Sequence, residues 1–259
     1  IHRIFWSFII LIPLVYITKQ VDVFKMTIKD VKKLKYLAFS TFFISLNWLV
    51  FIWAVANDMI METAFGYYIN PLVSVFLGYV FFGERMTRYQ NFAIFIAFLA
   101  VLYQLISLGS LPMVSLTLAL SFAFYGMIRK KINLGSIVGL CIETLILMPF
   151  ALIGIYYLMI NDKISFLNSS EYINIMLSLG GLITIIPLLL FNGAATRMKL
   201  STLGFFQYLG PTCAFLLAIF VYNEEFNSDK LITFTLIWIA LLIFSLDSFN
   251  TNRKKKSKE

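Results

Sequence analysis

The sequence is poor in charged residues, in histidine and in cysteine, and each shortage excludes a class of protein. Only 13% of the 259 residues are Asp, Glu, Lys or Arg, whereas an ordinary soluble domain has about 25%. Too few polar side chains are therefore present to cover a water-exposed surface. The single histidine is His2, and the two cysteines, Cys141 and Cys213, lie within apolar stretches. These residues leave no ligand set for a metal site.

The sequence also lacks the short motifs of common catalytic sites. It contains no Gly-x-x-x-x-Gly-Lys-Ser/Thr phosphate loop, no His-Glu-x-x-His and no Gly-x-Ser-x-Gly. We therefore expect neither an enzyme nor a primary pump, and no cofactor. The net charge of +8 comes from short basic clusters between apolar runs, which is typical of membrane topology and not of a nucleic-acid partner.

Long apolar stretches dominate the chain and predict helices that cross a lipid bilayer. A membrane helix needs about 20 mostly apolar residues to cross a hydrocarbon core of roughly 30 Å. Only helices satisfy their own backbone hydrogen bonds in lipid without a partner, so the predicted fold is all-α. The nine predicted spans are Ile4–Thr18, Tyr36–Ala56, Thr63–Phe82, Phe92–Leu108, Leu111–Met127, Ser136–Ile160, Ile173–Phe191, Ser201–Tyr222 and Leu231–Phe249.

The basic residues fall in alternate connections between these spans. Eighteen of the 21 Lys and Arg residues lie on one side, including six lysines in Lys19–Lys35 and the tail from Arg253. Lys and Arg are enriched on the cytoplasmic side of membrane proteins, so this side, with the C-terminus, is predicted to be cytoplasmic. Nine spans then place the N-terminus outside, and we expect one further helix upstream of Ile1.

Two stretches align without gaps at an offset of 140 residues, Thr63–Glu84 and Leu203–Glu224. The offset covers an odd number of spans, so the two copies are predicted to cross the membrane in opposite senses. Inverted repeats are typical of secondary transporters; the other interpretation is a pair of unrelated helices kinked by proline. The matched residues are Phe65, Tyr68, Pro71, Leu77 and Glu84 with Phe205, Tyr208, Pro211, Leu217 and Glu224.

Several blocks of sequence, spread over essentially the whole chain, resemble the RarD-type branch of the EamA, or drug/metabolite, transporter superfamily. No single block is specific, but their joint occurrence is. The blocks are His2–Ser7, Asn47–Val55, Gly66–Val73, Gly109–Pro112, Ser121–Gly126, Arg129–Lys131, Glu143–Thr144 with Pro149, Ala194–Arg197 and Leu200–Thr212.

The resemblance implies a ten-helix bundle of two inverted five-helix repeats in the inner membrane, with both termini cytoplasmic. Residues 1–108 would form the first repeat without its first helix, residues 109–249 the second, and residues 250–259 a basic tail. The branch is known through chloramphenicol sensitivity, and its physiological substrates are poorly defined. The transported partner expected from a pocket of Trp, Tyr, Asn and Gln is a small, partly aromatic or amphipathic organic solute.

Polar side chains inside predicted spans are candidate binding residues, since their burial in hydrocarbon is costly. Tyr67, Asn70 and Ser74 share one helix face, and Gln207 lies on the equivalent face of the second copy. The alternative for Asn70 and Gln207 is hydrogen bonding between helices. For the Trp and Tyr residues the alternative is a place in an aromatic belt. The further pocket candidates are Asn47, Trp48, Trp53, Tyr125 and Tyr208.

The remaining candidates concern coupling and gating. Glu143 is the only carboxylate clearly inside a span, so it is either a proton carrier or a structural residue held by an arginine or a hydrogen bond. His2 and Arg3 would contact substrate in an outer vestibule or anchor the helix at the membrane interface. The candidates for helix kinking and gating are Pro71, Pro211, Glu84 and Glu224.

These features together predict a secondary-active transporter that alternates access between inverted repeats. Its partners are the lipid bilayer, a small-molecule substrate and, if Glu143 is a proton carrier, protons. The alternatives are a non-transporting membrane protein and an intramembrane enzyme.

Overall fold

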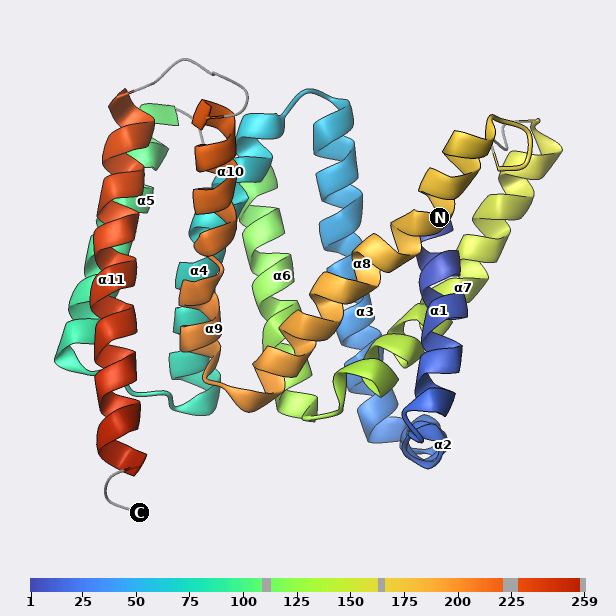
Figure 1. The fold of residues 1–259 in the computed structure, drawn as a ribbon, viewed down its shortest axis with the longest axis horizontal. Coiled ribbons are helices and arrows are strands. Elements are labelled where there is room, and N and C mark those ends of the chain that lie inside the picture. Colours follow the sequence, from blue (N-terminus) through green and yellow to red (C-terminus); the bar gives the residue numbers. More distant parts are fainter. Residues whose placement is uncertain (109–112, 163–165, 221–227, 257–259) are drawn as a thin grey trace. The chain divides into compact units, whose positions relative to one another are not determined.

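The structure, a computed structural model, describes residues 1–108, 113–162, 166–220 and 228–256, and the regular elements within these ranges are all α-helices (Figure 1). Within these ranges, each of the nine predicted spans coincides with a helix or with a pair of helices. The prediction of an all-α fold is confirmed. The physical reason is that a helix satisfies its backbone N–H and C=O groups internally, which hydrocarbon requires.

The chain divides into two compact units, and each unit takes segments from both halves of the sequence. The first unit is Ile1–Ser45 with Ile128–Arg197, and the second is Leu46–Met127 with Met198–Glu259. The first contains α1 (His2–Ile17), α2 (Val21–Lys29), the start of α3 (Val31–Ala56), the end of α6 (Met113–Ile132), α7 (Ser136–Ile160) and α8 (Glu171–Arg197). The second contains the rest of α3 and α6, together with α4 (Ile60–Phe82), α5 (Arg88–Leu108), α9 (Leu200–Phe206), α10 (Leu209–Phe220) and α11 (Ser228–Lys256).

Within the described residues, six helices are each long and apolar enough to cross a membrane, so the protein is a multi-pass membrane protein. A bent pair, α1 with α2, passes the same test together, with 117° between its two parts. α6 is not among the six, and its last turn carries three basic residues. The six spans are Val31–Ala56, Glu62–Phe82, Arg88–Ser107, Ser136–Ile160, Glu171–Arg197 and Leu231–Thr251.

The connection predicted at Lys19–Lys35 contains the short helix α2. The chain turns between α1 and α2 at Lys19, whose φ of 55° lies in the left-handed region. Phe24 of α2 packs against the first unit's core of Leu37, Val138 and neighbours, whereas Lys25 and Lys29 are exposed. α2 therefore turns Phe24 and the buried Thr27 toward protein, whereas its other apolar residues Val23, Met26 and Ile28 are exposed.

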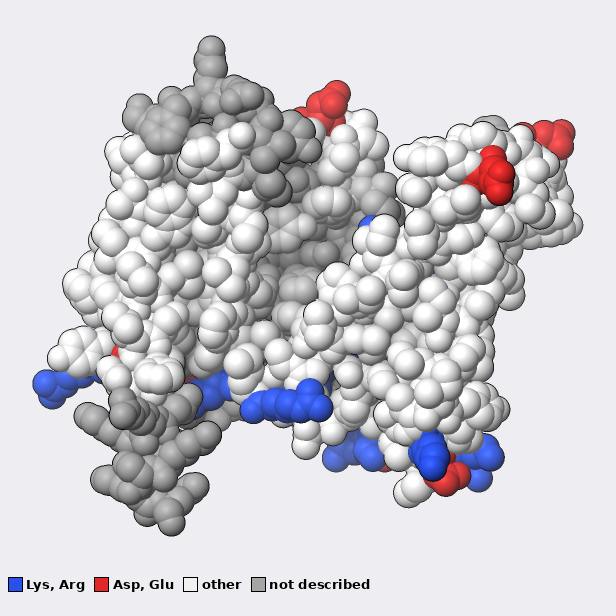
Figure 2. All heavy atoms as spheres, viewed as in Figure 1, with Lys and Arg blue, Asp and Glu red and all other residues white. Residues whose placement is uncertain are grey.

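Within each unit, a lysine of one predicted connection contacts a residue predicted to lie at the same side of the membrane. In the first unit the Lys131 Nζ lies 5.4 Å from the centre of the Tyr36 ring. In the second unit Lys199 Nζ donates a hydrogen bond to the Arg85 carbonyl oxygen at 3.3 Å. Figure 2 shows most visible Lys and Arg spheres of each unit near one end of its helices.

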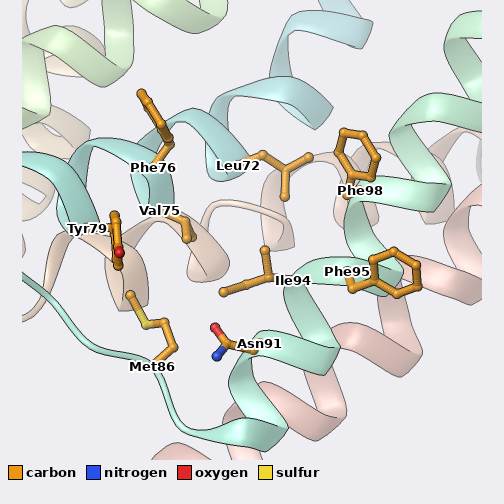
Figure 3. A pocket seen from close by; sticks show the side chains of 9 residues that line it. All are labelled: Leu72, Val75, Phe76, Tyr79, Met86, Asn91, Ile94, Phe95 and Phe98. Carbon is orange, nitrogen blue, oxygen red and sulfur yellow. The ribbon is translucent and has the colours of Figure 1, made fainter.

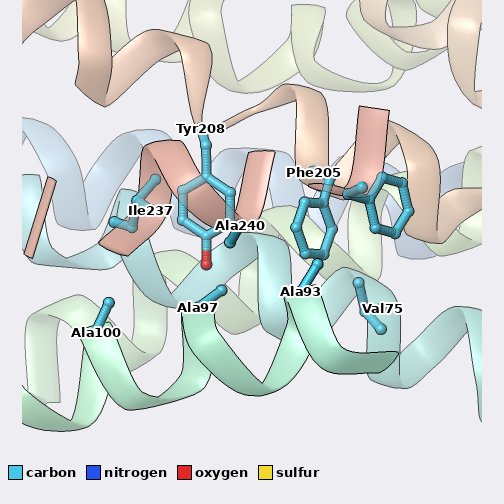
Figure 4. Close-up of a cluster of buried hydrophobic side chains, with 9 residues drawn as sticks. Val75, Ala93, Ala97, Ala100, Phe205, Tyr208, Ile237 and Ala240 are labelled. Atoms are coloured by element: carbon cyan, nitrogen blue, oxygen red, sulfur yellow. The ribbon is translucent and has the colours of Figure 1, made fainter. Parts of the chain in front are cut away.

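The core of the second unit is built on small residues of α5. Ala93, Ala97 and Ala100 form a buried stripe, and Ala240 of α11 is also completely buried (Figure 4). Small residues let two membrane helices approach closely. Phe205 of α9 stacks on Phe244 of α11, with ring centres 4.0 Å apart, so the same core holds α9 in place.

Candidate functional site

The two segments that align in the sequence, α4 and α9–α10, pack against each other within the second unit. α4 begins at Ile60 and α9 at Leu200, which is the offset seen in the sequence alignment. Gly204 of α9 lies directly on α4, since a Cβ there would be 2.8 Å from the Ser74 Cβ and 2.9 Å from the Pro71 carbonyl oxygen. The two backbones touch at this crossing, and the glycine permits it.

The copies differ in one respect: α4 is continuous through Pro71, but the second copy is broken between Phe206 and Leu209. Pro211 has no N–H and cannot bond to the Gln207 carbonyl oxygen four residues earlier. That oxygen instead accepts a hydrogen bond from Gly210 N at 3.1 Å, three residues later, as in a tighter turn. The described part of the predicted span Ser201–Tyr222, which ends at Phe220, is thus a discontinuous helix.

The break places Gln207 against Asn70, and the sequence analysis had placed these two residues on equivalent faces of the two aligned segments. Asn70 Nδ2 donates a hydrogen bond to Gln207 Oε1. Asn70 is buried, with 3% of its surface exposed. Within the described part of the chain, Asn70 Oδ1 and Gln207 Nε2 are buried without a hydrogen-bond partner. The pair therefore keeps one acceptor and one donor uncommitted.

Tyr208, next to Gln207 in the chain, makes a further contact with α4. The Tyr208 hydroxyl donates to the Tyr68 carbonyl oxygen at 3.2 Å, and Tyr208 is completely buried. Ser74 is also buried, while about half of the Tyr67 surface is exposed. Of the predicted pocket residues, Tyr208 thus joins the contact between α4 and α9–α10, and Tyr67 lies on the surface of α4.

The other predicted pocket residues lie on α3 and α6. Asn47 Nδ2 donates to the Leu118 carbonyl oxygen at 3.0 Å and to Ser121 Oγ at 3.1 Å, so it links these two helices. Trp48 is partly exposed and Trp53 half exposed, whereas Tyr125 is completely buried. The geometry of Asn47 is that of hydrogen bonding between helices.

Glu84 caps the start of α9. The left-handed Gly83, with φ 61°, ends α4 and turns the chain so that Glu84 points back toward the bundle. Its carboxylate accepts hydrogen bonds from Leu200 N at 2.7 Å, Ser201 N at 2.9 Å and Ser201 Oγ at 2.7 Å. A carboxylate at a helix N-terminus accepts hydrogen bonds from the free backbone N–H groups, and its negative charge interacts favourably with the helix dipole. Its partner in the repeat, Glu224, lies outside the described residues.

Glu143 of α7 lies in a second polar cluster, within the first unit. Glu143 is 1% exposed and Arg129, from the end of α6, is completely buried. Arg129 Nη1 is 3.7 Å from Glu143 Oε1, and Ser40 Oγ of α3 donates to the same oxygen at 2.5 Å. In the part of the chain that is described, Arg129 Nε, Nη1 and Nη2 make no hydrogen bond.

Sequence reasoning missed two members of this cluster. Arg129 was counted with Lys130 and Lys131 as a basic connection, yet its guanidinium fills the space beside Gly139, where a Cβ would be 1.9 Å from Nη1. Ser40 was not considered. The signal available was Gly139 itself, which lies one helical turn before Glu143 on α7 and leaves room for a large partner.

His2 and Arg3 begin α1. The centre of the His2 ring lies 5.4 Å from that of Phe166, which follows α7. The centre of the Trp6 ring lies 5.8 Å from that of the same Phe166. Arg3 is exposed. Ser7, one turn further along α1, donates to the Gly181 carbonyl oxygen of α8 at 3.3 Å. The start of α1 thus packs on the connection between α7 and α8.

The chain is similar to a family of membrane transporters and to several bacterial proteins. The model of the EamA-like transporter family matches residues 1–106. Protein RarD of Salmonella typhi is 46% identical over 254 residues, which cover 98% of this chain and 86% of that protein. Protein RarD of Escherichia coli is 45% identical over 253 residues, with the same two coverages.

A more distant relative carries a functional class in its name. The uncharacterized transporter YojE of Bacillus subtilis is 39% identical over 260 residues, covering 99% of this chain and 86% of that protein. No solved structure matches the chain significantly.

Proposed function

The chain belongs to the RarD-type branch of the EamA-like transporter family, and from this membership we propose that it is a secondary-active transporter of a small organic solute. It acts in the cell membrane with its C-terminus in the cytoplasm. Residues 1–108 and 109–249 are the two inverted repeats, and access alternates between the two sides of the membrane as one repeat moves against the other.

The observation that carries the proposal is the broken helix at Gln207 and its contact with Asn70. Discontinuous helices form the substrate sites of many secondary transporters, because unwound backbone exposes polar groups at membrane depth. Here Asn70 Oδ1 offers an acceptor and Gln207 Nε2 offers a donor, both buried. A buried polar group without a partner costs free energy, so a solute that supplies both partners binds favourably.

Proton coupling at Glu143 is the second part of the proposal. A buried ion pair is costly to form, and removal of either charge leaves the other uncompensated. Protonation of Glu143 removes the attraction that holds Arg129 and changes the balance between two arrangements of the first unit. The alternative role, a purely structural ion pair, has the same geometry but predicts no effect of a pH gradient.

The transport test is counterflow into liposomes that contain the purified protein. The solutes are a panel of small amides, alcohols and carboxylic acids, with chloramphenicol included because the family resemblance implies it. Saturable uptake of at least one solute is expected. The alternatives, a non-transporting membrane protein and an intramembrane enzyme, predict no saturable flux, and that result contradicts the proposal.

Uptake by single-residue variants tests whether Asn70 and Gln207 bind the solute. Asn70→Ala and Gln207→Ala are each expected to lower uptake about ten-fold, since one buried hydrogen bond to solute contributes roughly 1.4 kcal/mol. The matched control is Asn57→Ala, which removes an exposed amide that bonds only to the Trp53 carbonyl oxygen. Equal activity of all three variants would place the binding site elsewhere.

The coupling test compares wild type with Glu143→Gln, which preserves shape and hydrogen bonding to Ser40. Wild-type uptake is expected to respond to an imposed pH gradient, whereas the variant exchanges solute without responding to it. A variant that keeps the full response removes Glu143 from the coupling mechanism.

A further inference from the structure

The second unit carries a groove along α4 and α5 that includes none of the candidate site residues. Its volume is about 430 Å³. Its sides are almost entirely apolar, and several lining residues are open to the surroundings, with Phe76 62% and Phe95 54% exposed. The nine lining residues are Leu72, Val75, Phe76, Tyr79, Met86, Asn91, Ile94, Phe95 and Phe98 (Figure 3).

The two ends of the groove differ in polarity. On α4 the lining positions run from Leu72 to Tyr79, and on α5 from Asn91 to Phe98. Seven residues of helix rise about 10 Å, so the groove is long enough for the first part of an acyl chain. Figure 3 shows Tyr79 and Asn91 toward one end, with Phe98 toward the other. The first end is polar and the rest is apolar.

Positive charge surrounds the polar end. Arg85 Nη1 donates to the Tyr79 hydroxyl at 3.0 Å, and its guanidinium carbon lies 4.9 Å from the centre of that ring. Arg88 is one helical turn before Asn91, on the same face of α5. Both arginines are exposed. Lys199 adds a third cation, bonded to the Arg85 carbonyl oxygen.

The nearby carboxylates already have partners. Glu84 is held by the N–H groups at the start of α9, and Asp247 of α11 accepts a hydrogen bond from Thr87 Oγ1 at 2.7 Å. These hydrogen bonds leave both carboxylates charged, so the three cations Arg85, Arg88 and Lys199 are set against two carboxylates, and the net charge beside the groove is about +1.

We propose that this groove binds one anionic phospholipid. The phosphate lies between Arg85 and Arg88, and the upper part of one acyl chain lies along Ile94, Phe95 and Phe98. Apolar side chains exposed on a membrane helix face lipid, and basic residues at the cytoplasmic end of membrane helices attract anionic headgroups. A zwitterionic lipid fits the apolar part equally well but brings its own cation to the arginines, so the charge selects the anionic lipid.

The test is native mass spectrometry of the full chain in detergent, titrated with palmitoyl-oleoyl phosphatidylglycerol or with phosphatidylcholine of the same acyl chains. Wild type is expected to retain one phosphatidylglycerol at least about ten-fold more tightly than phosphatidylcholine. Arg85→Gln and Arg88→Gln each lower phosphatidylglycerol affinity about five-fold, the effect of one basic residue near an anionic lipid. The double variant with lysine at both positions keeps the preference.

Further variants distinguish lipid binding in this groove from unspecific attraction of anionic lipid to basic residues. Lys25→Gln and Lys29→Gln each remove one positive charge from exposed positions on α2, as the single arginine variants do at the groove, and phosphatidylglycerol retention is expected to stay unchanged. Ile94→Trp fills the groove without altering charge, and it lowers retention of both lipids at least five-fold.

Three results would overturn the proposal. One is equal loss of phosphatidylglycerol in the α2 control and in the arginine variants. Another is full retention in Ile94→Trp. The third is displacement of bound lipid by inorganic phosphate alone at millimolar concentration, since a lipid held by its acyl chain resists a free anion.

Discussion

The two buried polar clusters, one in each unit, pair their polar side chains by different kinds of interaction. In the second unit, Asn70 and Gln207 are neutral amides joined by one hydrogen bond across the break in the repeat. In the first unit, Arg129 and Glu143 are opposite charges joined across α6 and α7. Neutral amides are separated in a membrane protein at a cost of about 1 kcal/mol. Buried charges respond to protonation and are much harder to separate.

This difference fits the two roles proposed above. A substrate site has to open and close many times, so a weak neutral pair suits the role proposed for Asn70 and Gln207. A coupling residue has to change the molecule when one proton arrives, so a strong charged pair suits the role proposed for Glu143. The following predictions test whether the two clusters really differ in this way, from the largest expected effect to the smallest.

Arg129→Ala removes the cation beside Glu143 and is expected to lower the free energy of unfolding by about 3–5 kcal/mol. The double variant Arg129→Met with Glu143→Leu removes both charges and is expected to be much closer to wild type. Unfolding in detergent micelles, followed by tryptophan fluorescence as denaturing detergent is added, measures both. If the double variant is as unstable as the single one, the cost does not come from an unpaired charge.

Gly204→Ala introduces a Cβ 2.8 Å from the Ser74 Cβ and is expected to cost about 1–3 kcal/mol, as overpacking does. The control is Gly210→Ala, because nothing lies within 4 Å of a Cβ at that position. The same unfolding measurement compares them. Equal stability of the two variants would mean that α4 and α9 do not touch at Gly204.

A double-mutant cycle of Asn70→Ala and Gln207→Ala, based on free energies of unfolding, measures the interaction energy between the two amides. The expected coupling is about 0.6 kcal/mol, the average for hydrogen bonds between membrane helices, well below the effect of Arg129→Ala. Strictly additive changes would show that the two amides do not interact. A coupling as large as that of the charged pair would remove the distinction between the clusters.

The smallest effect concerns Asp30, an exposed carboxylate that contrasts with Glu143. Its Oδ1 accepts hydrogen bonds from the backbone N–H groups of Lys32 and Lys33 at 3.0 and 3.1 Å. The bond from Lys33 contributes most to holding the pKa of Asp30 below its ordinary value. A lowered pKa in the folded state gives stability that is present above the pKa of the unfolded chain.

That stability is lost as the pH falls through the lower pKa of the folded state. Below about pH 4 the wild type is therefore expected to melt slightly earlier relative to Asp30→Asn, which keeps a capping oxygen but does not titrate. Thermal unfolding between pH 3 and pH 7 measures the difference. Asp22→Asn, also exposed and acidic, is the control. Parallel pH curves for wild type and Asp30→Asn would contradict the capping role.

Much of the fold was predictable, because the signals are local. Apolar runs located the helices, and the match of Pro71 and Glu84 with Pro211 and Glu224 identified the paired segments. Periodicity placed Tyr67, Asn70 and Ser74 on one face. It did not show that Tyr67 lies at the surface while Ser74 is buried against Gly204, since a face of a membrane helix is divided between lipid and neighbouring helices by packing alone.

The candidate site was predictable in its residue types and less so in its contacts. Asn70 and Gln207 were singled out separately, and their hydrogen bond joins residues 137 apart. The bond from Ser40 to Glu143 joins residues 103 apart, and nothing in the sequence near Ser40 indicated it. The groove along α4 and α5 was not predicted, because its lining residues are ordinary apolar membrane residues.

What the sequence by itself determined is the class of protein: helices that cross a bilayer, with basic connections in alternation, follow from hydropathy and charge, which act residue by residue. The tertiary structure decided which polar groups meet. Whether a buried arginine, serine or amide finds a partner depends on the approach of helices far apart in the chain, and glycines such as Gly139 and Gly204 permit that approach only where the packed neighbour has the matching shape.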